Sequence, residues 1–137
     1  AQAIAKIIKE AGSQVVFFET WARKEGNSLY SGDLAGYDPI SMQAALKTAY
    51  STAAENTSSL YAPVGDAWEI ALNESPEIAL HSADGSHPSK AGSYLAACVF
   101  YALFTGESLS GNTFSPSGLS QEEIETLQGI ATELLIP

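Results

Sequence analysis

The sequence is poor in basic residues and in cysteine. Only six of its 137 residues are Lys or Arg, against sixteen Asp or Glu, which gives a formal net charge of −10. So few positive charges disfavour binding to phosphate backbones or anionic lipid, and we expect neither nucleic acid nor a membrane as a partner. The single cysteine, Cys98, excludes an internal disulfide and a CxxC metal knuckle, and its apolar neighbours predict a buried thiol.

Long hydrophobic runs are also absent. The sequence contains no stretch of 18 apolar residues and no basic-then-apolar leader, and it begins at Ala1 without methionine. We expect a soluble protein, with a periplasmic or secreted location compatible, and it stays open whether the natural chain begins before Ala1. Its length and its 45% hydrophobic residues predict one globular domain over 1–137.

Hydrophobic patterns alternate between helix and strand along the chain. Helices are expected at 1–11, 39–54, 67–72, 88–104 and 121–134, and short apolar strands at 15–18, 60–64 and 78–80, with a long loop at 19–37 and a Ser/Gly-rich connection at 107–119. The pattern is typical of the α/β class. Because helix-length segments separate the strands, we expect all three to be neighbours in one parallel sheet.

A parallel sheet of three strands is smaller than usual. We therefore expect the sheet to be incomplete, with one edge of 15–18 open to a further strand. An apolar open edge favours association. The expected partner is a missing N-terminal segment of the same domain or a second chain.

Asp84 and His87 follow the last predicted strand, where α/β sheets place their ligand sites. At this spacing the carboxylate can accept from the Nδ1–H of the imidazole and leave Nε2 free as a base. The alternative is a polar turn that starts a helix, with the aspartate as a cap and the histidine solvated.

Two blocks carry a resemblance to a known family. The runs 84–89 (DGSHPS) and 92–97 (GSYLAA) resemble the last conserved block of the SGNH-hydrolase (GDSL-like) superfamily, and 17–23 and 62–68 follow the order seen in a bacterial branch of it. The similarity covers about residues 1–106. It implies a three-layer flavodoxin-like sandwich, of which this chain is the C-terminal portion. It further implies that His87 is the general base and Asp84 its partner in a serine ester hydrolase, without a cofactor, acting on a small-molecule or carbohydrate ester such as an acetyl ester.

The family's early blocks are not recognisable in this chain. The family has a serine nucleophile in an early G-x-S block and oxyanion donors from later Gly and Asn blocks. The run 26–29 (GNSL) imitates a nucleophile block, but no predicted strand precedes it, so it is not assigned as the nucleophile. A chain with only the Asp–His pair should be nearly inactive by itself. The alternative function is a non-catalytic binding or scaffold domain derived from a truncated hydrolase fold.

Three further residues are candidates for substrate binding. Trp21 and Trp68 follow predicted strands and could line a pocket, although plain core packing is an equal alternative. Arg23 could bind a substrate carboxylate or hydroxyl, or form a surface ion pair. His81 could join the pair as a metal ligand, but no third ligand follows at a helical spacing, so no metal site is predicted.

Overall fold

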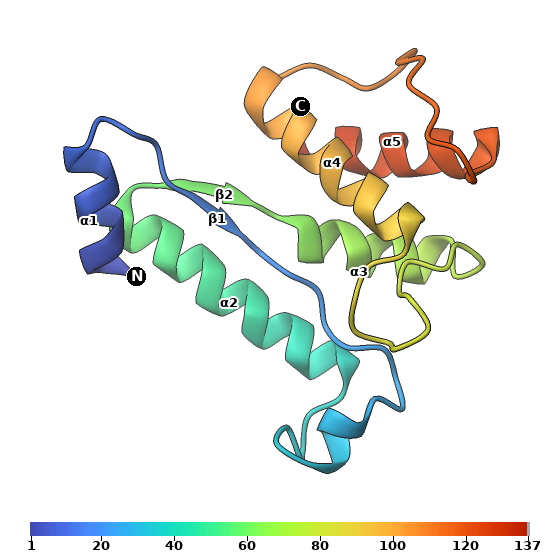
Figure 1. Ribbon diagram of the computed structural model, residues 1–137, viewed down its shortest axis with the longest axis horizontal. Helices are drawn as coiled ribbons and strands as arrows, with labels where there is room; N and C mark the ends of the chain where they lie inside the picture. The colour runs from blue at the N-terminus through green and yellow to red at the C-terminus, as the bar shows by residue number, and fades with distance from the viewer. Residues whose placement is uncertain (137) are drawn as a thin grey trace.

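The computed structural model describes residues 1–136 and has an α/β architecture (Figure 1). Its elements are α1 (Gln2–Glu10), β1 (Val16–Phe18), the 3-10 helix η1 (Ser28–Ser31), α2 (Pro39–Thr57), β2 (Leu60–Ala62), α3 (Val64–Glu74), α4 (Lys90–Thr105) and α5 (Gln121–Leu135). The five expected α-helices are therefore present. None of the helices in this range is long and apolar enough to cross a membrane.

Two of the three predicted strands pair as expected. β1 and β2 are parallel, with Val16 opposite Leu60 and Phe18 opposite Ala62. The Leu60 amide donates to the Val15 carbonyl at 3.0 Å, so it is the odd-numbered residues of β1 that bond to β2. The backbone groups of Val16 and Phe18 point the other way, to an edge that no strand covers within residues 1–136.

The prediction of a third strand at 78–80 is wrong. This segment buries Ile78 and Leu80, which explains its strand-like pattern. Its backbone bonds elsewhere: the Ile78 amide donates to the Ser75 carbonyl at 3.0 Å, and the Leu80 carbonyl accepts from the Ser89 amide at 2.7 Å. The chain turns back on itself beyond this point, through an antiparallel bridge between His81 and Pro88, and does not join the sheet.

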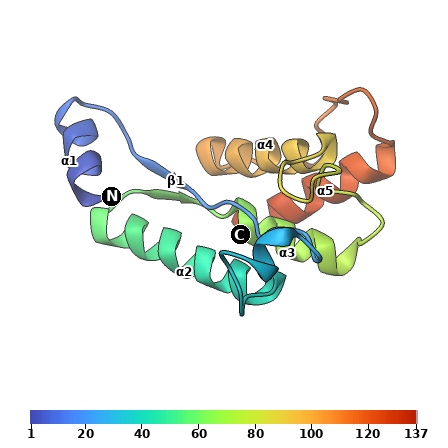
Figure 2. The same cartoon turned by 60° about the horizontal axis from the view of Figure 1, so that its bottom comes forward.

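Helices cover both faces of the small sheet. On one face the Glu19 carboxylate accepts a hydrogen bond from Gln43 of α2 at 2.7 Å. On the other face Phe18 packs edge-on against Phe100 of α4, with 5.1 Å between the ring centroids. Figure 2 shows α2 and α4 on opposite sides of the strands. The fold is the expected three-layer α/β sandwich with a parallel, incomplete sheet.

The main hydrophobic core lies among α3, α4 and α5. Its largest fully buried apolar side chains are Trp68, Leu80, Leu95, Ile124, Leu127, Val64 and Val99. Gly92 lets α4 approach closely, because a Cβ atom there would lie 2.4 Å from both the Leu80 carbonyl oxygen and the Trp68 ring. The core thus fixes α4 against the segment that leads into Asp84 and His87.

Candidate functional site

A turn between residues 82 and 89 places His87 just before α4. Gly85 adopts a left-handed φ of 65°, which favours glycine, and its amide donates to the Ser82 carbonyl at 3.0 Å. Ser89 then caps α4, because its hydroxyl oxygen accepts from the Gly92 amide at 3.1 Å. The imidazole of His87 is thereby held at the entrance of the helix and outside its body.

Asp84 and His87 contact each other directly. Asp84 Oδ2 lies 2.5 Å from His87 Nδ1, and Oδ1 accepts from the amides of Ser86 and His87, both at 2.9 Å. The bond to the His87 ring, followed by those two amides, holds the pKa of Asp84 well below its usual range. An ionised carboxylate can only accept, so the Nδ1 atom carries the proton and Nε2 is left as a base. The contact expected between these residues is present.

The pair is open to solvent. The side chain of His87 is 79% exposed and that of Asp84 49% exposed. Nearby serine hydroxyls bond elsewhere: Ser89 Oγ donates to the Ala79 carbonyl at 2.6 Å, and Ser93 Oγ to the Ser89 carbonyl at 2.8 Å. Residues 1–136 therefore show an Asp–His pair with no serine hydroxyl hydrogen-bonded to it.

The predicted substrate-binding residues lie next to this turn. Trp21 stacks on Trp68 with ring centroids 4.0 Å apart, and its indole Nε1 donates to the Ser86 carbonyl at 3.0 Å. Arg23 Nη1 donates to the same carbonyl at 3.3 Å. Trp68 is fully buried, so it offers no free ring face to a sugar, which fits the core-packing alternative.

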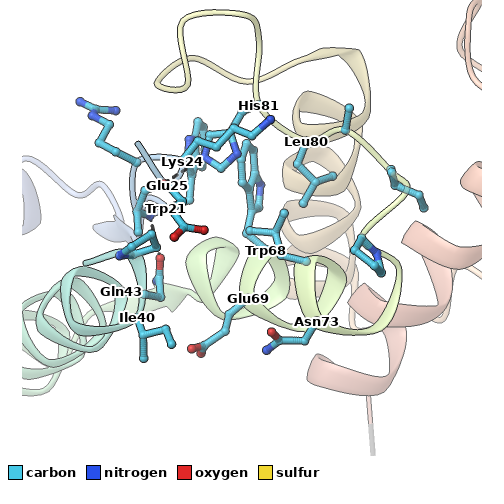
Figure 3. Close-up of a pocket in the computed structure, with 17 residues that line it drawn as sticks. Trp21, Lys24, Glu25, Ile40, Gln43, Trp68, Glu69, Asn73, Leu80 and His81 are labelled. Carbon is cyan, nitrogen blue, oxygen red and sulfur yellow. Dashed lines mark hydrogen bonds between the residues drawn. The ribbon is translucent and has the colours of Figure 1, made fainter. Parts of the chain in front are cut away.

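A pocket of about 560 Å³ lies on the α2–α3 side of the tryptophan pair. Figure 3 shows Trp68 in its wall, Ile40 and Gln43 on the α2 side, and Glu69 and Asn73 along α3. The residues lining it include Trp21, Arg23 and Trp68 but neither Asp84 nor His87. The structure thus brings the substrate-binding candidates together in one pocket and places the Asp–His pair outside it.

His81 also lines the pocket and does not join the Asp–His pair as a ligand set. Its Nε2 lies 3.0 Å from the Ala22 carbonyl oxygen, and burial lowers the pKa of its imidazole. The described part of the chain contains no group of three or more His, Cys, Asp or Glu residues that could hold a metal ion.

The sequence analysis missed two residues that support the candidate site and the helix next to it, Glu19 and Asn27. Glu19 is fully buried, accepts from the Asp66 amide at 3.2 Å, and so caps α3 from the end of β1. Asn27, from the run that imitates a nucleophile block, donates through Nδ2 to the Asp84 carbonyl at 3.2 Å. A carboxylate directly after a strand was a usable signal for Glu19, whereas nothing local marks Asn27 as a neighbour of Asp84.

No protein-family model matches this chain, and no curated protein sequence matches it either. A search of solved structures finds a DUF4886 family protein from Bacteroides uniformis ATCC 8492, with a TM-score of 0.81 and 21% identity. The match covers 96% of this chain and 52% of that protein, so this chain spans about half the length of its structural neighbour. At this identity the likeness concerns the fold alone.

Proposed function

We propose that this chain provides the Asp–His half of a serine ester hydrolase site. His87 acts as the general base through Nε2, and Asp84 orients and stabilises the imidazole. The observation that supports this most is the 2.5 Å contact between Asp84 Oδ2 and His87 Nδ1, on an exposed turn just before α4. The resemblance of 84–97 to the SGNH block adds the reaction class, with a small-molecule or carbohydrate ester as the substrate.

The serine and the oxyanion donors then come from another segment, in the same polypeptide or in a second chain. The open edge of β1 gives such a segment a strand to pair with. A structural neighbour of nearly twice the length is consistent with a larger domain.

The functional test uses the complete protein and p-nitrophenyl acetate as a small acetyl ester. Replacing the base, His87→Ala, should lower kcat by about 10⁶, whereas Asp84→Asn should cost less, about 10⁴, because it leaves the base in place. A fluorophosphonate probe should label one serine in the wild type and not in His87→Ala. The chain of 137 residues by itself should hydrolyse the ester very slowly.

A non-catalytic binding domain is the second candidate. It is favoured by the pocket, which lies apart from Asp84 and His87, and by the serine hydroxyls that bond elsewhere. If the complete protein takes up no fluorophosphonate and His87→Ala leaves ester hydrolysis unchanged, the hydrolase proposal fails and the binding role stands.

A further inference from the structure

Three consecutive backbone carbonyls of the turn that contains Asp84 and His87 accept hydrogen bonds from the segment that follows β1. The Asp84 carbonyl accepts from Asn27 Nδ2 at 3.2 Å, and the Gly85 carbonyl accepts from the Lys24 amide at 2.9 Å. The next carbonyl, that of Ser86, accepts from both Trp21 and Arg23, as described above. The segment 21–27 therefore supports the turn over three peptide units in succession.

These bonds matter because the turn has little packing of its own. Asp84 and His87 are exposed, so apolar contacts do not fix their side chains. The Ser86 carbonyl belongs to the peptide that leads into His87, so holding it sets the orientation of that residue. The other side of the turn is fixed by Ser82, because its amide donates to the His87 carbonyl at 2.8 Å.

Glycine at position 85 suits the close contact between the turn and the segment 21–27. Besides its left-handed φ, a Cβ atom on Gly85 would lie 3.2 Å from the Cβ of Lys24. A side chain at position 85 would therefore be crowded against Lys24.

The two stacked tryptophans differ in what their indole N–H groups do. Trp21 Nε1 donates to Ser86, whereas Trp68 Nε1 is buried without a partner among the described residues. One face of Trp21 stacks on Trp68, and its ring is tilted against that of Phe18 at 6.3 Å between centroids. Of the stacked pair, Trp21 is therefore the member that bonds to the turn.

We propose that the segment 21–27 is the positioning element of the Asp–His pair, and that Trp21 and Asn27 are positioning residues that act through the 84–86 backbone. This inference rests on the proposed function for its catalytic meaning. It assigns Trp21 a role in orienting the base in place of one in stacking on a sugar.

The test measures the tautomer of neutral His87 by ¹⁵N NMR, a readout that does not depend on hydrolysis. In the wild type the proton should reside mainly on Nδ1. Trp21→Phe keeps an aromatic ring but loses the donor, and it should shift the tautomer ratio toward Nε2–H by about fivefold. Asn27→Asp keeps Oδ1, which accepts from the Leu29 amide at 3.1 Å, but loses the Nδ2 donor, and it should act in the same direction.

Trp68→Phe is the matched control, because it removes an indole N–H that donates to no described residue. It should leave the His87 tautomer ratio as in the wild type. Unchanged ratios in both Trp21→Phe and Asn27→Asp would overturn the proposal, and so would an equal shift in Trp68→Phe. Should Trp21→Phe fail to fold, Asn27→Asp alone decides between these results.

Kinetics of the complete protein separate this inference from the proposed function. A positioning role for Trp21 predicts that Trp21→Phe lowers kcat by about fivefold and leaves KM unchanged, whereas a lost sugar contact would raise KM. A wild-type protein that hydrolyses no ester but shows the expected tautomer shifts would refute the hydrolase and leave the positioning element standing.

Discussion

The helical half of the molecule, α3 to α5, and the sheet half, α1 to β2, bury very different residues. The helical half encloses large apolar side chains such as Trp68, Leu95 and Leu127. The sheet half fully buries Glu19 and leaves Ile4 65% and Phe18 37% exposed. Although Phe104 and Phe114 are also exposed, the helical half encloses a core of large apolar side chains, whereas the buried hydrophobic residues of the sheet half are alanines and its strand edge is uncovered. We expect stability to reside mainly in the first and association in the second.

The largest effect is expected from a glycine in the helical core. Gly92→Ala would place a methyl group against the Leu80 carbonyl and the Trp68 ring, neither of which can move freely, so it should cost about 3 kcal/mol of unfolding free energy. Gly129→Ala is the matched control in α5, where nothing lies within 4 Å of the new Cβ, and it should stabilise by about 0.5–1 kcal/mol. Urea unfolding measures both, and a similar value for the two would contradict the close approach of α4.

The second prediction concerns the two edges of β1. Phe17→Pro removes an amide that faces β2, which leaves the Leu60 carbonyl unsatisfied and should cost about 2 kcal/mol. Val16→Pro removes an amide that faces the uncovered edge, so it should cost less stability but prevent a further strand from pairing there. Circular dichroism melting compares the stabilities.

Sedimentation velocity then tests what the open edge does. The wild-type chain should self-associate as its concentration rises, and Val16→Pro should stay monomeric. A wild-type chain that is monomeric at every concentration tested would contradict the prediction that this edge pairs with another strand.

The third prediction concerns the buried carboxylate of the sheet half. Burial raises the pKa of Glu19, with the nearby Asp66 carboxylate adding to the rise, while the Tyr61 hydroxyl and Gln43 lower it and Lys47 is a further charged neighbour. The folded state thus binds this proton more tightly than the unfolded chain does, so stability should fall as pH rises from about 4.5, the unfolded value, through the folded pKa.

Glu19→Gln should remove this fall, which urea titrations from pH 4 to 8 can measure. The exposed Glu77→Gln is the control and should run parallel to the wild type. Parallel curves for Glu19→Gln and the wild type would show that the buried carboxylate does not govern the pH dependence.

Local signals in the sequence predicted the fold well. Asp38 before Pro39 and Ser120 before α5 both form the N-caps that their residue types favour, and the apolar run at Val16 is a strand. The same logic failed at 78–80, because burial gives a similar pattern whether or not the backbone joins a sheet. A strand must hydrogen-bond to a neighbouring strand. Here the Leu80 carbonyl instead accepts from the Ser89 amide, and the Ile78 amide donates to the Ser75 carbonyl.

The candidate site was predictable only in part for a similar reason. His87 follows Asp84 by three positions, so the geometry of one turn brings them together locally. The bonds from Trp21 and Asn27 to that turn join residues 65 and 57 positions apart, which only the tertiary structure decides. Residue type suggested that Trp21 lines a site, but its hydrogen-bond partner could not be read from its neighbours.

The smallest expected effect lies at the far end of the sheet half, where α1 meets α2. Lys9 Nζ donates to the Thr57 carbonyl, and also to that of Ser58 at 2.8 Å, at the C-terminus of α2, where a positive charge is favourable. Lys9→Met keeps much of the aliphatic length and loses the charge, so it should cost about 0.5 kcal/mol at low salt and less at high salt. Lys6→Met is the matched control on the same helix, because Lys6 forms an ion pair with the exposed Glu10 at 3.7 Å within α1, so its loss should cost about 0.2 kcal/mol. Equal costs for the two variants in urea unfolding would mean that Lys9 does not join α1 to α2. A clear excess at Lys9 that fades with salt would instead show that its charge helps to hold α1 against the C-terminus of α2.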